Sequence, residues 1–286
     1  DRGRTCRLAA GGPEDVPGTT VDRQCGSAQQ AVHFAAQAVM AGVNDLVVAG
    51  GVQQMSQIPI SSAMTLASDL GFPDPFTTSP GWVARYGPDE VSQFTGAELI
   101  AKKWDLSRDE MEAFAVESHT RALKAQANGA FDGEITPLEG ITADEGPREP
   151  NWEKIRSLKT LVPEGRLTAA CASQISDASA SILIASEQAV EDHGLTPRAR
   201  IHHMSVRGDD PIMMLTAPIP ATRHALQKTG MTMADIDAVE INGAFASVVL
   251  AWAKELQPDM ATVNPNGGAI ALGHPLGMSG ARITLH

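Results

Sequence analysis

A helix-forming segment followed directly by a short apolar strand segment is the feature that most limits the possible folds of this chain. From Ser27 to Met40, apolar residues recur at the spacing of one helix face, and Gly42 ends the pattern. The next apolar stretch, DLVVAGG at residues 45–51, is short and rich in valine, as buried strands are. A helix and a strand in immediate succession predict the α/β class, because such units build a sheet covered by helices.

The same alternation resumes in the second half of the chain. The segments predicted there are a strand and a helix at 177–194, a strand at 199–208, a helix that ends at Gly230, a strand with Val239 and Ile241, and a helix that stops before Pro258. Between the two halves, residues 57–167 differ in character. They are loop-rich, apart from an amphipathic helix that Ser107 is expected to cap at its N-terminus.

Charge and cysteine content exclude several classes of partner. The formal net charge of −12 would repel both nucleic acid and an anionic membrane. No apolar run approaches the roughly 20 residues that cross a bilayer. The cysteines Cys6, Cys25 and Cys171 match neither a disulfide framework nor a metal motif. We therefore expect a protein of the reducing cytoplasm that binds no metal, no nucleic acid and no membrane.

Cys25 lies where an extended segment turns into the helix of residues 27–40. Backbone N–H groups at a helix start favour an anion, so this position is expected to lower the thiol pKa and to raise the fraction of thiolate. The position therefore predicts a nucleophile. A small packing residue is the alternative, because free cysteine is common in protein cores.

Two further segments carry candidate polar groups. Residues 264–282, NPNGGAIALGHPLGMSGAR, hold His274 among five glycines, and we expect Gly273 and Gly277 to let the backbone approach a substrate. The imidazole is suited to pair with a thiolate or to donate to an oxyanion, unless this is a simple surface turn. Asn242, after a predicted strand, is suited to hold a water, although Asn-Gly pairs are more often turns.

Together these segments resemble the thiolase family of acyl-CoA C-acyltransferases. VDRQCGSAQQAV at 21–32 resembles the nucleophile segment, NGAFA at 242–246 the Asn-Glu-Ala-Phe motif, and residues 264–282 the Gly-His-Pro signature. Residues 167–187 are similar to the segment that contacts CoA, and residues 144–166 to the stretch leading into it. The resemblance implies a layered αβαβα fold of two similar halves with an inserted loop domain.

The resemblance also implies a domain division. It gives 1–56 as the first part of the N-terminal half, 57–172 as the inserted loop domain, 173–195 as the return to the N-terminal half, and 196–286 as the C-terminal half. Family segments before Cys25 and after His286 are expected to be missing in part. Among them is the family's second catalytic cysteine, which acts as the acid and base in a Cys-x-Gly motif.

The roles that the resemblance implies describe a ping-pong reaction. Cys25 would take the acyl group of an acyl-CoA as a thioester, and His274 would help to activate it. A water held by Asn242 would form an oxyanion hole with His274, and Ser173 would lie beside the pantetheine arm of CoA. The substrates are acyl-CoA and CoA, with no cofactor, in fatty acid metabolism including β-oxidation. Family members are usually homodimers or homotetramers.

Two residues depart from the family pattern. Gly243 replaces the motif's Glu, and this change affects the water expected near Asn242. Cys171 occupies the position where the CoA segment usually has Asn, and we expect it to be a buried packing thiol. These departures leave open a thiolase-like protein that binds CoA or lipid without turnover. A condensing enzyme of the ketoacyl-synthase kind is disfavoured, because it would have a histidine at position 242.

Overall fold

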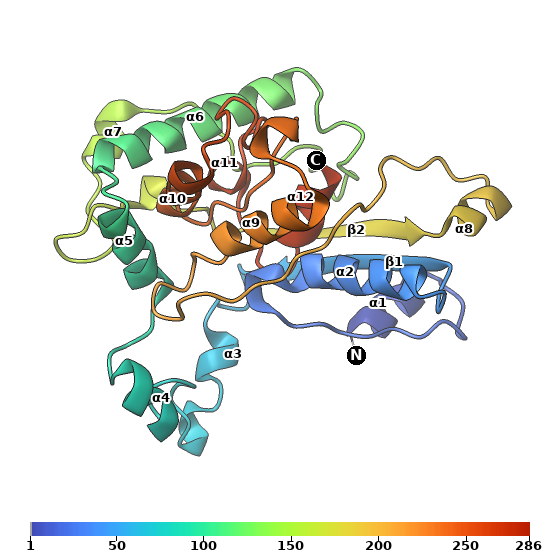
Figure 1. Ribbon diagram of the computed structural model, residues 1–286, viewed down its shortest axis with the longest axis horizontal. Coiled ribbons are helices and arrows are strands. Elements are labelled where there is room, and N and C mark those ends of the chain that lie inside the picture. Colours follow the sequence, from blue (N-terminus) through green and yellow to red (C-terminus); the bar gives the residue numbers. More distant parts are fainter. Residues whose placement is uncertain (1) are drawn as a thin grey trace. The chain divides into compact units, whose positions relative to one another are not determined.

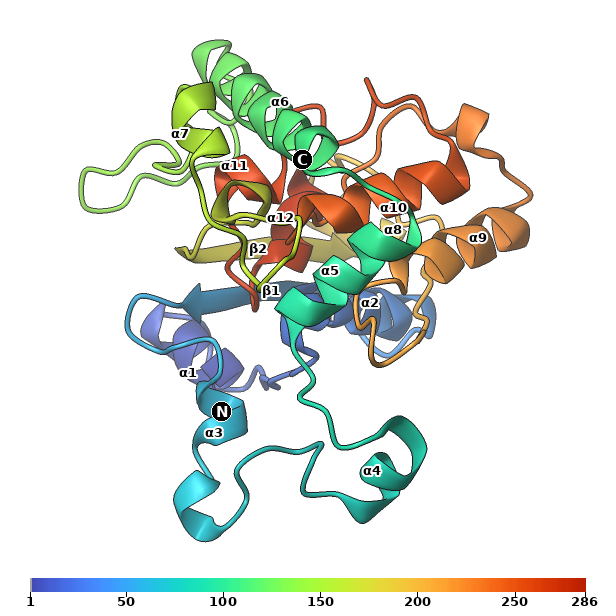
Figure 2. The same ribbon diagram turned by 90° about the vertical axis from the view of Figure 1, so that its left-hand side faces the viewer.

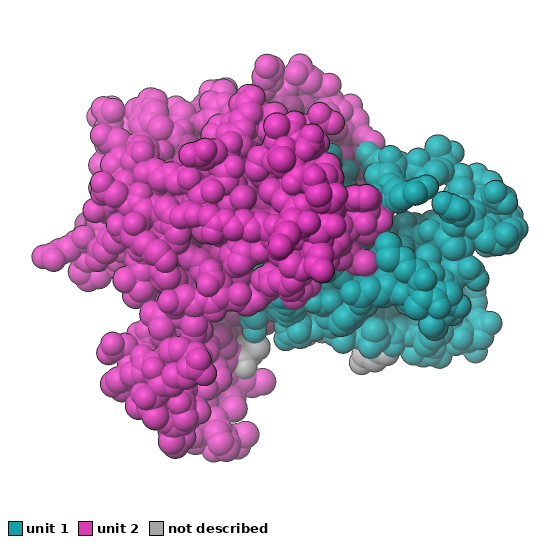
Figure 3. Space-filling view, viewed as in Figure 1, with its two compact units in different colours: residues 1–53, 178–200, 275–286 teal, residues 54–177, 201–274 magenta. Residues whose placement is uncertain are grey.

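The computed structural model describes residues 2–286, which group into two compact units (Figure 3). Of the described residues, unit 1 takes those up to Gln53 together with Ala178–Arg200 and Pro275–His286. Unit 2 takes Gln54–Asp177 and Ile201–His274. The domain boundaries expected from the family resemblance stay a prediction.

Unit 1 is built on a two-stranded sheet of β1 (Leu46–Gln54) and β2 (Asp177–Ala185) (Figure 1). The Ser186 N–H donates to the Asp45 carbonyl at 2.8 Å, and the backbone of Gly50 lies against Ala180. Residue numbers that rise on one strand therefore fall on the other, so the strands are antiparallel. Strands at both of these positions were predicted and are confirmed.

Helix α2 (Ser27–Met40) buries one face of small and branched residues, among them Ala28, Val32 and Ala36. It packs against α12 (Ser279–Leu285), and the contact depends on glycine. A Cβ on Gly280 would lie 2.3 Å from the backbone nitrogen of Gln29, which is closer than any side chain tolerates. The predicted helix at 27–40 is confirmed.

Unit 2 is mainly helical, and its longest helix is α6 (Arg108–Ala127) (Figure 2). Ser107 and Glu110 form a capping box, in which each side chain accepts a hydrogen bond from the backbone N–H of the other residue. The N-cap predicted at Ser107 is therefore confirmed. Helix α6 contacts α10 (Ala246–Leu256) and α11 (Ala269–Leu272), and α5 (Gln93–Lys103) packs against α10.

The remaining helices are short, apart from α9. They are α1 (Arg2–Ala9) and α8 (Glu187–Asp192) in unit 1, and α3 (Ser62–Thr65), α4 (Pro80–Tyr86), α7 (Trp152–Arg156) and α9 (Pro218–Thr229) in unit 2. The 3-10 turns are η1 (Gln24–Gly26), η2 (Ser68–Leu70), η3 (Ala169–Cys171) and η4 (Met233–Asp235). Helix α9 ends as predicted at Gly230, whose φ of 72° lies in the left-handed region. Within residues 2–286, no helix is both long and apolar enough to cross a membrane.

Two predicted strands are wrong. Residues 199–208 have no regular secondary structure and pair with no strand in the described part of the chain. Val239 forms only an isolated bridge with Val263, because the side chain of Asn264 takes the place of a neighbouring strand. Asn264 accepts from the Ile241 N–H at 2.8 Å and donates to the Ile241 carbonyl at 3.0 Å. The sheet and the helices around it are consistent with the predicted α/β class.

Candidate active site

Cys25 lies in the middle of η1, directly before helix α2. The residue before it, Gln24, has a φ of 50°, which is unfavourable for a residue with a side chain. The turn is held by Ser27, whose hydroxyl accepts from the Arg23 N–H at 2.8 Å and donates to the Gln24 carbonyl at 2.7 Å. The Gln24 N–H also donates to the Asp22 carboxylate at 3.0 Å. These bonds compensate for the strained backbone next to the thiol.

The Cys25 thiol is half-buried, and this burial raises its pKa above the ordinary value. A backbone N–H bond lowers the pKa in part, but loss of hydration is the larger effect. The expectation of a lowered pKa at this helix start is therefore wrong. The thiol is mostly protonated at neutral pH, so a base has to take its proton before it can act as a nucleophile.

Gly277 lies in the same compact unit as Cys25 and packs against strand β1. Its N–H donates to the Gln53 side chain at 3.1 Å, and a Cβ on it would lie 2.8 Å from the Val52 carbonyl oxygen. Gly51, on the same strand, would bring a Cβ to 3.1 Å from that of Ala28 in α2. Glycines thus bring β1 close to the start of α2. The predicted contact of Gly277 with substrate stays a prediction.

His274 is buried in unit 2, with 4% of its surface exposed, and its Nε2 lies 3.2 Å from the Nδ2 of Asn242. The amide nitrogen can only donate, so Nε2 accepts and the proton of a neutral ring sits on Nδ1. The Oδ1 of Asn242 is buried and has no hydrogen-bond partner among the described residues. A buried acceptor without a partner is a place where a bound water is expected.

Gly273 sets the direction of the chain at His274. It follows α11 with a φ of 85° and a ψ of 168°, a conformation that is nearly restricted to glycine. A Cβ at this position would also lie 1.9 Å from the Oγ of Ser176. Gly273 therefore serves the backbone geometry here, and its predicted contact with substrate is not tested by these distances.

Ser173 lies beside the segment that carries Asn242. Its N–H donates to the Ala244 carbonyl at 2.8 Å, and the neighbouring Ala172 forms an isolated antiparallel bridge with Phe245. The predicted CoA segment and the NGAFA segment are thus adjacent, although they are far apart in the sequence. Ser173, Asn242 and His274 all belong to unit 2.

Gly243 follows Asn242 and faces α10. A Cβ on Gly243 would lie 2.8 Å from the Cγ2 of Val249, whose side chain is completely buried. Valine is stiff at χ1, so the methyl group cannot easily turn aside. Val249 in α10 therefore leaves little room for a side chain at position 243. The motif's Glu would not fit there without rearrangement.

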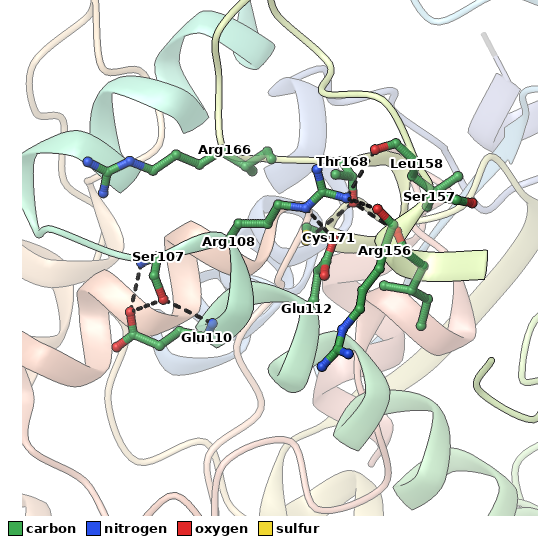
Figure 4. Close-up of polar contacts among 12 residues, drawn as sticks. Ser107, Arg108, Glu110, Glu112, Arg156, Ser157, Leu158, Arg166, Thr168 and Cys171 are labelled. Carbon is green, nitrogen blue, oxygen red and sulfur yellow. Dashed lines mark hydrogen bonds and ion pairs between the residues drawn. The ribbon is translucent and has the colours of Figure 1, made fainter. Parts of the chain in front are cut away.

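A polar cluster fixes the stretch that precedes Ser173 (Figure 4). Arg108 pairs with Glu112 at 2.7 Å and donates to the carbonyls of Arg156 and Leu158, each at 3.0 Å. Cys171 is completely buried, as expected, and burial raises its pKa, with a further contribution from the Glu112 carboxylate. Cys171 is therefore a packing residue with a protonated thiol.

Gln174, next to Ser173, was not singled out by the sequence analysis. Its backbone carbonyl accepts from the His274 N–H at 3.1 Å, and its side chain bonds three other backbone carbonyls and Arg148. No local sequence pattern marks such a residue, because its partners lie in distant segments.

Comparison with known proteins identifies relatives that match nearly the whole chain. The family models "Thiolase, N-terminal domain" and "Thiolase, C-terminal domain" match residues 2–188 and 195–286. The steroid 3-ketoacyl-CoA thiolase FadA6 of Mycobacterium tuberculosis is 61% identical over 280 residues, which cover 96% of this chain and 69% of that protein. A 3-oxoadipyl-CoA/3-oxo-5,6-dehydrosuberyl-CoA thiolase of Escherichia coli is 41% identical over 302 residues, 99% of this chain and 75% of that protein.

Solved structures of known proteins also match nearly the whole chain. Human mitochondrial 3-ketoacyl-CoA thiolase in complex with CoA matches with a TM-score of 0.85 and 34% identity, covering 99% of this chain and 73% of that one. The layered fold expected from the motifs is thereby confirmed. The names of these relatives favour neither of the two alternatives to a thiolase, the CoA- or lipid-binding protein without turnover and the ketoacyl synthase.

Proposed function

This chain belongs to the thiolase family, and from that premise we propose how its residues carry out the reaction. It is an acyl-CoA C-acyltransferase, an enzyme that makes or cleaves 3-ketoacyl-CoA. The observation that supports the proposed roles most directly is the buried pair of Asn242 and His274 beside the segment of Ser173. Cys25 is proposed as the nucleophile, and His274 as the group that activates it, on the basis of the family motifs alone.

In the cleavage direction, the thiolate of Cys25 attacks the 3-keto carbon of the substrate and forms a tetrahedral oxyanion. The bond between the α and β carbons then breaks, which leaves the shortened acyl group on Cys25 and an acetyl-CoA enolate that takes up a proton. The thiol of a second CoA attacks the acyl-cysteine and releases the shortened acyl-CoA. The Cys25 thiol is restored at the end, as in a ping-pong mechanism.

His274 is proposed to take the proton of Cys25, because burial keeps that thiol protonated at neutral pH. In the resting state Asn242 donates to Nε2, which orients the imidazole ring, and Nε2 is proposed to exchange this bond for the Cys25 proton when the thiol is activated. The unpartnered Oδ1 of Asn242 is proposed to hold a water that, with His274, donates to the thioester oxyanion. Donors fixed before the reaction begins lower its barrier most, because they need not reorganise.

The substrate class is proposed from the relatives. Several are named for 3-ketoacyl-CoA substrates, and one that is 61% identical is named for a steroid 3-ketoacyl-CoA. We propose that this chain cleaves a 3-ketoacyl-CoA whose acyl group derives from a steroid, with CoA as the second substrate. Comparison of kcat/KM for such a thioester with that for acetoacetyl-CoA tests the choice. A clear preference for acetoacetyl-CoA would reject the steroid class and leave the acyl transfer intact.

The remaining properties are also proposals. The chemistry needs no metal or redox cofactor, so treatment with a chelator should leave the rate unchanged. A homodimer or homotetramer in the cytoplasm is proposed from the family membership alone. Light scattering on the purified protein measures the oligomeric state.

The nucleophile is tested by intact-protein mass spectrometry after exposure to a 3-ketoacyl-CoA without free CoA. An acyl adduct should form on Cys25 and should be absent from Cys25→Ser. The exposed Cys6 supplies the matched control, because Cys6→Ser should retain both the adduct and the turnover. An adduct that maps to Cys171 or Cys6 would contradict the assignment.

A further inference from the structure

Gln174 connects three segments of unit 2 through one side chain and one carbonyl. Its Nε2 lies 3.0 Å from the Gly146 carbonyl oxygen, 3.3 Å from that of Ile270 and 3.0 Å from that of Ala271. Its Oε1 accepts from the Arg148 guanidinium at 2.7 Å. An amide nitrogen has two hydrogens, so at least one of them is shared between two of the three carbonyls.

The two helical carbonyls bound by Gln174 belong to α11, the short helix that leads into Gly273 and His274. The last carbonyls of a helix have no partner within it, and this helix has only four residues. The Gln174 amide therefore acts as a side-chain cap for α11. The backbone carbonyl of the same residue accepts from the His274 N–H at 3.1 Å.

The loop on the other side of Gln174 fits closely against α11. A Cβ on Gly146 would lie 2.4 Å from the Ala271 carbonyl oxygen and 3.0 Å from the Gln174 Nε2. The Arg148 N–H also approaches Nδ1 of the buried His119 at 3.4 Å. This loop, residues 144–148, lies in the stretch that leads into the proposed CoA segment.

We propose that Gln174 is a positioning residue for His274, which holds the imidazole segment in register with the 144–148 loop and with the neighbouring Ser173. This inference rests on the proposed role of His274. It predicts that the placement of the imidazole depends on the Gln174 amide, even though that amide touches neither the ring nor the reacting atoms. Capture of the CoA thioester at Ser173 and proton transfer at His274 then depend on one shared side chain.

The test replaces Gln174 by Met, which keeps the length of the side chain and removes all of its hydrogen bonds. Misplacement of a catalytic group by about 1 Å typically costs up to about 100-fold in rate, so kcat should fall about 10–100-fold. The rate is expressed per Cys25 that iodoacetamide can titrate, so that loss of folded protein does not count. KM for the thioester should change by less than about 3-fold, because the residue acts on the chemical step.

Gln126→Met is the matched control. Gln126 donates its Nε2 to the Asp144 carbonyl at 2.8 Å and so anchors the same loop through a hydrogen bond that goes neither to α11 nor to His274. Its kcat should stay within about 3-fold of the wild type. An equal loss in both variants would show that loop attachment in general is what matters, and it would overturn the proposal.

Gln174→Glu supplies the readout that a merely structural role would not change. An ionised carboxylate cannot donate to the carbonyls of Gly146 and Ala271, whereas a protonated one can donate to one of them. The kcat of Gln174→Glu relative to wild type should therefore rise as the pH falls, while the ratio for Gln174→Met stays flat. This variant also decides the matter if Gln174→Met does not fold.

His274→Ala separates failure of this inference from failure of the proposed function. Full activity in His274→Ala would reject the role of the histidine itself. A large loss in His274→Ala together with wild-type kcat and pH dependence in both Gln174 variants would reject the positioning role alone.

Discussion

The side-chain amide of Asn242 lies 3.2 Å from Nε2 of the buried His274, 32 positions away in the sequence. The contact fixes the orientation of the imidazole ring and leaves one amide oxygen, Oδ1 of Asn242, without a partner among the described residues. The pair therefore combines a fixed imidazole with a place for one water. This is the combination that an oxyanion formed on a thioester needs in a site shielded from bulk water.

Asn242→Ala should lower kcat about 10²–10³-fold, which is the usual cost of one lost oxyanion-hole donor. Asn242→Asp separates the loss of the donor from the loss of volume. Its carboxylate would favour the imidazolium form of His274 and raise the pKa of the ring. The acidic limb of the profile of kcat/KM against pH should then move to higher pH. An unchanged profile in Asn242→Asp would show that Asn242 does not act through the histidine.

The rate at which iodoacetamide alkylates Cys25 should rise with pH. This rise should occur at a higher pH than it does for an ordinary thiol. Iodoacetamide reacts with the thiolate, and burial raises the pKa of Cys25, so that less thiolate is present at pH 7. Peptide mapping after partial reaction follows Cys25 and Cys171 in the same sample. Cys171 is completely buried and should react only after unfolding. Faster reaction at Cys171 in the folded protein would contradict both the burial and the assigned roles.

Local pattern predicted α2, α6, α9 and α10, because a helix is closed by bonds between near neighbours. It missed α5 (Gln93–Lys103), which lies in the stretch that was expected to be loop-rich. Ser107 and Glu110 are three residues apart and form the cap of α6, and Gly230 ends α9 through its own backbone conformation. A strand depends on a partner elsewhere in the chain. Residues with β-type spacing around Ile241 are bonded instead by the side chain of Asn264, 23 positions away. The apolar spacing alone does not predict such a substitution.

The residues of the candidate site also divide into those that a local sequence pattern marks and those that depend on distant segments. Its motif residues are recognisable because each lies in a distinctive local segment. Gln174 lies outside any such pattern, because its amide reaches Gly146, 28 positions away, and Ala271, 97 positions away. The direction of the Cys25 pKa shift was also mispredicted, because the helix start is visible in the sequence whereas the burial that outweighs it is not.

Folding stability should depend on His119 when the pH falls below about 6.5. Burial, helped by the nearby Arg148, lowers the pKa of this histidine from 6.5 to about 4. Since the unfolded chain then binds the proton more tightly than the folded chain, stability is greatest above pH 6.5 and is lost as the pH falls towards 4. The loss attributable to this group at pH 5 is about 2 kcal/mol.

Urea unfolding of wild type and His119→Asn at pH 7 and pH 5 measures this contribution. Asparagine keeps an acceptor for the Arg148 N–H but does not titrate, so the variant should lose less stability between the two pH values. The exposed His193 gives the control, and His193→Asn should follow the wild type. Equal pH dependence in wild type and His119→Asn would contradict the prediction.

Gly273→Ala should lower both stability and activity. The alanine would have to adopt the φ of 85° and would bring its Cβ to 1.9 Å from the Ser176 hydroxyl, directly before His274. Unfavourable backbone conformations of this kind cost about 1–3 kcal/mol, before any clash is counted. Adding Ser176→Ala should recover only part of the loss, because it removes the hydroxyl but leaves the backbone strain and the Cβ of residue 176 at 2.9 Å. Thermal melting and kcat measure the two effects.

Gly81→Ala is the control for Gly273→Ala. Gly81 lies near the start of α4, and a Cβ there would meet no atom within 4 Å. Alanine at such a position should be neutral or stabilise by up to about 1 kcal/mol, because it restricts the unfolded chain. A comparable loss at both glycines would show that the strain at Gly273 is not the cause.

The last prediction concerns Gly243, where the thiolase motif has Glu. Gly243→Ala alone should destabilise the protein, because its Cβ would lie 2.8 Å from the buried Cγ2 of Val249. Overpacking of this kind typically costs about 1–3 kcal/mol. Val249→Ala alone should also destabilise the protein, because it leaves a cavity beside α10. In the double variant the new methyl group enters the space that the valine vacates, so its loss of stability should be smaller than the sum of the two single losses.

A double-mutant cycle by urea denaturation gives the coupling energy, and we expect a favourable value of at least about 0.5 kcal/mol. The kcat of each variant then shows whether the same contact also sets the position of Asn242. If Gly243→Ala lowers kcat and the added Val249→Ala restores it, the valine is what keeps the residue after Asn242 small. Additive stability losses with no recovery of kcat would mean that Gly243 and Val249 are independent, and the missing Glu would then need another physical explanation.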